Sequence, residues 1–231
     1  MTKTISNWQV RVPRYGEEQD VRKKYWILSE GTNTEYWYFR RLNELRAVLG
    51  IDPLIAILPV KKDNEGHSDP KTLLMEAEKL ENDTEVNGYT SETDEIVLIF
   101  DADIYSSKPD EYSVLLKDIQ KNKYLYGVTN PAFELFLLLH LKGSLEKTIF
   151  PNQQEILENR KKSKNGHRYV AHLLSEETNK NPKKNPAIAN LAKDVAVAIE
   201  QEKMLNQDPE AAIHSLTSNI GTIIQKMMDE S

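Results

Sequence analysis

The sequence predicts an α/β fold in which a mainly parallel sheet is flanked by helices and followed by a helical C-terminal portion. Up to about residue 145, short apolar runs alternate with longer segments whose apolar residues recur at helical spacing. One run, Ile96–Phe100, is fully apolar, which is typical of a central parallel strand buried on both faces. From Phe150 onward only helical patterns follow. We therefore expect a core with an N-terminal lead-in over residues 1–145 and a helical extension over residues 146–231, packed as a single compact unit.

Four apolar runs bounded by charged or turn-forming residues are predicted as strands. Pro59 lies near the end of the second run and places it at a strand end or on an edge, because proline has no N–H to donate to a neighbouring strand. The predicted strands are residues 25–28, 54–60, 96–100 and 124–129.

Helix start signals follow the strands. Thr32 and Glu35 have capping-box spacing, and the helix that they open should end at Gly50. Asp69 followed by Pro70 is an N-cap with proline at the first helical position. The other predicted helices are residues 109–121, opened by a second capping box at 107–110, residues 132–141, after the break at Asn130-Pro131, and the segments 151–162, 168–179, 186–205 and 209–229.

The composition excludes several classes of protein. The 231 residues suffice for a real core, and the absence of cysteine excludes disulfide scaffolds, cysteine nucleophiles and thiolate metal sites. The longest nearly apolar run, Phe133–Leu141, is far too short to span a membrane, and the first residues lack the apolar stretch of a secretory signal. We expect a soluble cytoplasmic protein with no membrane partner. The net charge of -6 argues against a uniformly basic surface for duplex binding, although local patches can override net charge.

Acidic residues follow two predicted strands and begin one predicted helix. Glu30 comes directly after the first strand, Asp101 and Asp103 come directly after the third, and Glu134 lies in the first turn of helix 132–141. Ligand sites of open α/β sheets lie at the carboxyl ends of the strands, so these carboxylates are candidates for one site. Carboxylate oxygens suit Mg²⁺ or Mn²⁺, which can polarise a phosphodiester and activate a bound water.

The Asp101-x-Asp103 spacing has other interpretations. It also occurs in solvated loops and helix caps, and that interpretation stays open. An EF-hand loop would need glycine and glutamate at its sixth and twelfth positions, where the chain has Ser106 and Tyr112. A phosphoaspartyl hydrolase would have threonine or valine two residues after the second aspartate, where the chain has Tyr105. The sequence thus argues against both of these classes.

A basic segment is the candidate nucleic-acid contact. Residues 159–175 contain lysines, arginines and histidines but no acidic residue, and such cations bind phosphate backbones. Lys180, Lys183 and Lys184 form a second basic group. For both groups the alternative is a solvated helix end or loop. The residues of the first group are Arg160, Lys161, Lys162, Lys164 and Arg168.

Two longer segments resemble the signatures of a known family. They are Ile27–Phe39 (ILSEGTNTEYWYF) and Asn130–His140 (NPAFELFLLLH), in which Phe136 stands where tryptophan is more usual. Together they resemble the RloB-like family of the TOPRIM superfamily over most of residues 20–230, with similarity to OLD-type nuclease domains. For His140 we expect a partly buried histidine with satisfied hydrogen bonds.

The resemblance implies a TOPRIM-like sheet of the Rossmann type and a role for each carboxylate. Glu30 would be the general acid or base and a metal ligand, and Asp101 and Asp103 would be metal ligands. Glu134 would either complete the metal site or hold a basic partner. These four residues are the predicted catalytic residues, with Mg²⁺ or Mn²⁺ as the cofactor.

RloB-like proteins are typically encoded beside an ABC- or AAA-type ATPase in phage-defence or abortive-infection loci. The resemblance therefore implies a toxin-like, Mg²⁺-dependent nuclease effector that cleaves RNA, tRNA included, or DNA under the control of a partner ATPase. A homodimer is compatible with this expectation. The rival interpretation is a non-catalytic sensor or partner subunit of an ATPase complex, and a third is a phosphatase or nucleotidyl hydrolase.

Overall fold

A five-stranded sheet with the order β2-β1-β3-β4-β5 forms the centre of the molecule. The computed structural model describes residues 21–61, 69–82, 88–161 and 166–230. The first four strands in chain order pair in parallel, and β5 pairs antiparallel with β4. The strands are β1 (Lys23–Ser29), β2 (Ile55–Pro59), β3 (Glu95–Asp101), β4 (Leu125–Asn130) and β5 (Thr217–Ser218). The predicted α/β fold with a mainly parallel sheet is confirmed.

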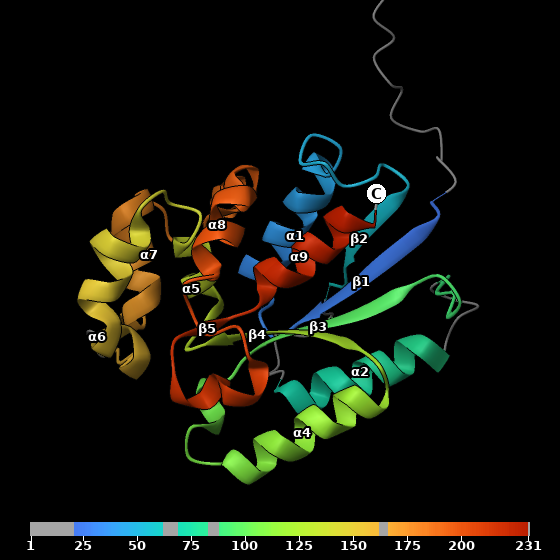
Figure 1. Cartoon of the computed structure of the whole chain (residues 1–231), viewed down its shortest axis with the longest axis horizontal. Helices are drawn as coiled ribbons and strands as arrows, with labels where there is room; N and C mark the ends of the chain where they lie inside the picture. Colours follow the sequence, from blue (N-terminus) through green and yellow to red (C-terminus); the bar gives the residue numbers. More distant parts are fainter. Residues whose placement is uncertain (1–20, 62–68, 83–87, 162–165, 231) are drawn as a thin grey trace, which may run out of the picture.

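Helices cover both faces of the sheet (Figure 1). The α-helices are α1 (Thr34–Leu45), α2 (Pro70–Asn82), α4 (Pro109–Lys121), α5 (Phe133–Leu138), α6 (Gln153–Glu158), α7 (Tyr169–Thr178), α8 (Val195–Glu202) and α9 (Ile220–Asp229). Shorter 3-10 helices span Asp103–Tyr105, Phe150–Asn152, Pro186–Asp194 and Pro209–His214, and a π-helix spans Leu145–Ile149.

The alternating side chains of β3 show how the two faces are filled. Val97 and Ile99 belong to a core cluster with α1, α5, α8 and α9, whereas Ile96, Leu98 and Phe100 belong to a second cluster with α2 and α4. Figure 1 shows the same two layers, with α1 and α9 on one side of the sheet and α2 and α4 on the other. A central strand that is apolar on both faces is what a doubly covered parallel sheet requires.

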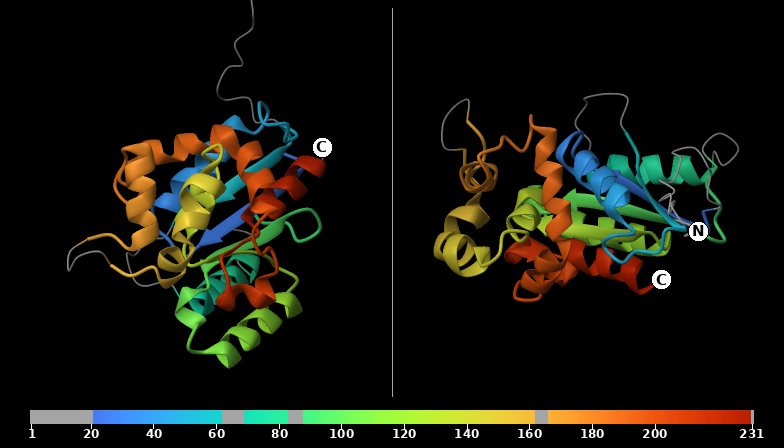
Figure 2. Two further views of the ribbon diagram at one scale, coloured as in Figure 1. Left: turned by 60° about the vertical axis from the view of Figure 1, so that its left-hand side comes forward. Right: turned by 90° about the horizontal axis from the view of Figure 1, so that it is seen from above.

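The first cluster joins both halves of the chain. It includes residues of the predicted 1–145 core together with residues of α7, α8 and α9. In Figure 2, α6 and α7 stand beside the carboxyl ends of the strands, where they face the loops that follow β1 and β3. No helix among the described residues is both long and apolar enough to pass through a bilayer.

The predicted capping boxes are wrong, whereas the Asp69 cap is confirmed. Helix α1 begins after Asn33 and α4 after Lys108, and neither start has a side-chain cap. The backbone N–H of Thr72 does donate to Asp69 Oδ1 at 2.8 Å. Glu35 is buried, and its carboxyl group occupies the space beside Gly31.

The segment 209–229 is not the single helix that its apolar spacing predicts. It forms the 3-10 helix Pro209–His214, then β5, then α9. The side-chain amide of Asn130 donates to the carbonyls of Ala212 and Ser215, both at 2.8 Å, and so ties this segment to the end of β4. Pairing satisfies backbone groups of β4 that would otherwise lie at the sheet edge, and that gain overrides the helical pattern.

Candidate functional site

Glu30 and Asp101 lie side by side at the carboxyl ends of two neighbouring parallel strands. Glu30 follows β1, and its backbone N–H donates to the carbonyl of Ile99 at 2.9 Å. Asp101 is the last residue of β3, and its N–H donates to Glu30 Oε2 at 3.3 Å. Strand pairing therefore brings together two carboxylates that are about seventy residues apart in the sequence.

Thr129 fixes the Asp101 side chain. It lies opposite Asp101 in the β3–β4 register, and its hydroxyl donates to Asp101 Oδ1 at 2.5 Å. The sequence identifies Thr129 only as the end of a strand. A signal was nevertheless present, because residues at the carboxyl end of a central parallel strand lie at the same edge as the acids that follow the neighbouring strands.

The site concentrates negative charge. The pKa of Asp101 is raised well above its usual value, first because the group is buried and then because of the charges of Glu30, Glu35 and Glu134. The hydrogen bond from Thr129 opposes this shift. A divalent cation would relieve the repulsion between these groups, as an opposite charge favours the ionised form of a carboxyl group.

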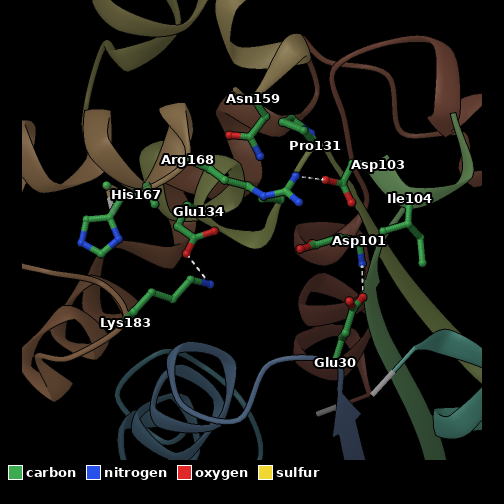
Figure 3. Close-up of a pocket in the computed structure, with 13 residues that line it drawn as sticks. Glu30, Asp101, Asp103, Ile104, Pro131, Glu134, Asn159, His167, Arg168 and Lys183 are labelled. Atoms are coloured by element: carbon green, nitrogen blue, oxygen red, sulfur yellow. Dashed lines mark hydrogen bonds and ion pairs between the residues drawn. The ribbon is translucent and has the colours of Figure 1, made fainter. Parts of the chain in front are cut away.

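A cavity of about 350 Å³ opens between these carboxylates and the C-terminal half of the chain. In Figure 3, Glu30, Asp101 and Asp103 lie along one wall, and Glu134 and Lys183 lie across from them. The residues that line the cavity come from the loops after β1, β3 and β4, the segment 159–171 and Lys183.

Arg168 reaches across the cavity to Asp103. Its Nη1 lies 2.6 Å from Asp103 Oδ2, and its side chain is 54% exposed against 20% for the aspartate. Burial raises the pKa of Asp103 above its usual value, while the charge and hydrogen bond of Arg168 act in the opposite direction. Arg168 is thus a residue of the predicted basic segment that lines the cavity, as is its neighbour His167.

Glu134 pairs with a lysine. Glu134 lies in the first turn of α5 with a side chain that is only 3% exposed, and its Oε1 is 2.6 Å from Lys183 Nζ. Of the two roles that the sequence left open for Glu134, the structure shows the pairing with a basic residue. Lys183 was predicted only as a member of a solvent-facing or nucleic-acid-binding group.

Glu35 is an acidic neighbour that sequence reasoning took for a helix cap. It is 4% exposed, and a Cβ atom on Gly31 would lie 1.9 Å from its carboxyl oxygen. The glycine after Glu30 therefore makes room for a buried carboxyl group. The spacing EG-x-x-x-E in residues 30–35 was the available signal, since the glycine and the second glutamate meet at the start of α1.

The donors fit a hard cation, although they do not form a closed cage. Within the described parts of the chain, no group of three or more histidine, aspartate or glutamate side chains is arranged to hold a metal ion. Mg²⁺ is usually held by one or two carboxylates and completed by water and substrate phosphate. The pair Glu30 and Asp101, with Asp103 nearby, offers this kind of open oxygen site.

Arg160 and Lys161, two other residues of the predicted basic group, do not line the cavity. Arg160 is 82% exposed and pairs with Glu158 at 3.1 Å, and Lys161 is exposed. Lys162 and Lys164 fall outside the described residues. The backbone of Lys161 forms an antiparallel bridge with that of Arg168, which links this segment to the cavity wall.

His140 is hydrogen-bonded, as expected, but it is fully buried where partial burial was predicted. It is 2% exposed, with Nε2 3.0 Å from the hydroxyl of Tyr38 and Nδ1 3.0 Å from the carbonyl of Phe136. Burial lowers its pKa to about 4, so the ring is neutral near pH 7. It packs between α1 and α5 and is not among the residues that line the cavity.

Residues 25–230 match the family model described as RloB-like protein. No curated protein and no solved structure matches the chain. The matched range contains all four candidate carboxylates together with Arg168 and Lys183.

Proposed function

Because the chain belongs to the RloB-like protein family over nearly its whole length, we propose that it is a TOPRIM-type nuclease of a bacterial phage-defence system. In this proposal it cleaves phosphodiester bonds of RNA, tRNA included, or of DNA in the cytoplasm, with Mg²⁺ or Mn²⁺ as cofactor. A partner ATPase holds or triggers this activity in abortive infection.

One observation carries the proposal: Glu30 and Asp101 meet at the carboxyl ends of adjacent parallel strands in a cavity that concentrates negative charge. Carboxylates that lie close together in a buried site repel one another, and groups with shifted pKa values gather at sites where a ligand relieves such repulsion. Oxygen donors and a shortage of positive charge together favour a hard divalent cation as that ligand.

The three acids at the strand ends and Thr129 each have a role in this proposal. Asp101 and Asp103 hold the cation, which when bound neutralises developing charge on the phosphodiester. Glu30 moves the proton of the attacking group. Thr129 keeps the Asp101 carboxylate directed into the cavity.

The test is the substitution Glu30→Gln, which preserves the size and removes the charge. We expect cleavage and toxicity in cells to fall by at least ~100-fold, the range lost with a general acid or base, with an unchanged circular dichroism spectrum. The control is Glu44→Gln, on α1, where the carboxylate is exposed and pairs with Arg41 at 2.8 Å. Full activity of Glu30→Gln would refute the assignment.

A second candidate function is a non-catalytic partner subunit of an ATPase complex. It is favoured by the ion pairs of Asp103 with Arg168 and of Glu134 with Lys183, each at 2.6 Å, because these neutralise two of the four carboxylates. Titration with Mn²⁺ followed by electron paramagnetic resonance separates the two candidates. Absence of binding and of cleavage, with and without the ATPase, would establish the second.

A further inference from the structure

Lys183 is held in the cavity by a short segment between α7 and the 3-10 helix Pro186–Asp194. The hydroxyl of Thr34, the first residue of α1, donates to the carbonyl of Pro182 at 2.9 Å. The N–H of Lys183 donates to Asn181 Oδ1 at 3.0 Å, and the amide of Asn181 lies 3.0 Å from His167 Nε2. The two residues that precede Lys183 are thus held by hydrogen bonds, so its side chain extends from a defined backbone.

The ammonium group of Lys183 lies between a buried carboxylate and the open cavity. Its partner Glu134 is 3% exposed, whereas the Lys183 side chain is 49% exposed and lines the cavity. Burial alone would lower the pKa of Lys183, but the charges of Glu134, Glu35 and Asp101 raise it above its usual value. The group is therefore a permanent cation that faces the carboxylates of the other wall.

The ion pair of Lys183 and Glu134 is better explained by binding of an anionic ligand than by a contribution to the stability of the fold. A buried ion pair contributes little net stability, because desolvation of both charges offsets their attraction. An ammonium group has three N–H donors, so one can bind Glu134 while the others reach a ligand oxygen. The ligand that fits between a cation on one wall and metal-binding carboxylates on the other is a phosphate group.

We propose that Lys183 binds a phosphate of the substrate backbone, and that Glu134 is the positioning residue of this lysine and not a metal ligand. The proposal rests on the proposed function for the identity of the ligand as a nucleic acid. The basic residue that completes the site thus comes from the C-terminal half of the chain, while the carboxylates on the opposite wall come from the strand ends.

The test uses a charge-balanced double variant, Lys183→Met with Glu134→Gln, which removes both members of the ion pair and does not alter the net charge. The matched control is Lys203→Met with Glu200→Gln, an exposed pair with the same N–O distance of 2.6 Å. Binding is measured in EDTA by fluorescence anisotropy with a fluorescein-labelled single-stranded oligoribonucleotide and with the DNA of the same sequence.

We expect the Lys183/Glu134 variant to bind roughly tenfold more weakly, as for the loss of one charged hydrogen bond. The slope of log affinity against log salt should fall by about 0.7, the value of one contact to a single strand. The control variant should bind like the wild type. Equal affinity of the Lys183/Glu134 variant and the wild type, or no binding by the wild type, would overturn the role of Lys183.

The role of Glu134 is read from metal binding. In Mn²⁺ titrations, the Lys183/Glu134 variant should retain the affinity of the wild type within about twofold, whereas Asp101→Asn should lose at least tenfold. A loss in the double variant as large as in Asp101→Asn would make Glu134 a metal ligand and overturn this part. If Glu30→Gln still cleaves, the proposed nuclease site fails, yet the binding result without metal still decides whether Lys183 holds a phosphate.

Discussion

The carboxyl group of Asp101 is buried at a strand end close to three other acids, and this environment raises its pKa. Thr129 stabilises its ionised form by a 2.5 Å hydrogen bond, while burial and the charges of Glu30, Glu35 and Glu134 oppose ionisation. A group whose pKa is raised in the folded state destabilises the fold when it is ionised. The cost is fully present above the raised pKa and disappears as the pH falls through it. Ionised Asp101, which is proposed to hold the cation, therefore lowers the stability of the fold when no cation is bound.

We predict that Asp101→Asn makes the protein more stable and inactive. In EDTA at pH 8 the melting temperature should rise by a few degrees, since about 2–4 °C corresponds to 1 kcal/mol for a chain of this size. The amide still accepts the hydrogen bond from Thr129, so only the charge is lost. Differential scanning calorimetry and a cleavage assay provide the two measurements.

The control for this substitution is Asp118→Asn on the exposed face of α4. It should change neither the melting temperature nor the cleavage. A lower melting temperature of Asp101→Asn in EDTA would contradict the proposed electrostatic repulsion, whatever happens to activity.

His140 gives the fold a pH dependence of known sign. Its pKa of about 4 in the folded state lies below the value of 6.5 for an unperturbed histidine. The unfolded chain therefore takes up a proton first as the pH falls, and stability is lost between about pH 6.5 and 4. At pH 5 this single group should cost about 2 kcal/mol relative to pH 8.

Comparison with His140→Gln isolates this effect from that of the carboxyl groups. Glutamine can keep a hydrogen bond to Tyr38 or Phe136 and does not titrate. We predict that the wild type loses about 2 kcal/mol more than the variant between pH 8 and pH 5 in urea unfolding. Equal losses would show that His140 is not held neutral in the folded protein.

Among the elements, the start of α9 depends on a carboxylate from the end of α8. Glu202 is fully buried and accepts hydrogen bonds from the N–H of Gly221 at 2.9 Å, from the N–H of Thr222 at 3.0 Å and from the hydroxyl of Ser218 at 2.5 Å. It thereby satisfies the first N–H groups of the helix and places a negative charge at the positive end of its dipole. A Cβ on Gly221 would lie 2.7 Å from Glu202 Oε2.

We predict that Gly221→Ala destabilises the protein by about 1–3 kcal/mol, the cost of overpacking, although alanine favours helices. Gln225→Ala, one turn later on α9, should change the free energy of unfolding by less than about 0.5 kcal/mol. Urea unfolding of both variants measures the difference. A stabilised Gly221→Ala protein would show that the cap tolerates displacement of Glu202.

At the scale of the whole molecule, the sheet and its covering layer do not end near residue 145. The strand β5 pairs with β4, and residues of α7, α8 and α9 share one apolar cluster with β1, β2, β3 and α1. The cavity likewise has walls from both halves of the chain. Stability and site thus both depend on contacts between distant segments.

We predict that a fragment of residues 1–145 does not fold, whereas the full chain unfolds in one cooperative transition. Without α8 and α9 the fragment would expose the apolar face that these helices cover. Circular dichroism against temperature on both proteins is the measurement. A cooperative transition of the fragment would show that residues 146–231 are an independent extension.

The sequence predicted most of the fold because the determinants are local. The strands show as apolar runs, and Asp69 caps its helix as its position next to Pro70 indicates. The predictions failed where a local sequence pattern was overridden by contacts with distant parts of the chain. Glu35 has capping-box spacing but is buried beside Gly31, and the apolar spacing of residues 209–229 is helical throughout although β4 recruits Thr217 and Ser218 as a strand.

By itself, the sequence determined the alternation of strands and helices and, through it, the position of Glu30 and Asp101 at strand ends. That follows because the direction of a parallel strand fixes which of its ends carries the site. Only the tertiary structure decided which charges meet. Asp103 with Arg168 and Glu134 with Lys183 are pairs separated by dozens of residues, and chain packing brings each to 2.6 Å. Lys183 cannot be told from its neighbours Lys180 and Lys184 by sequence, because all three belong to one basic group. Its pairing with Glu134 and its place in the cavity wall follow from the packing of the folded chain.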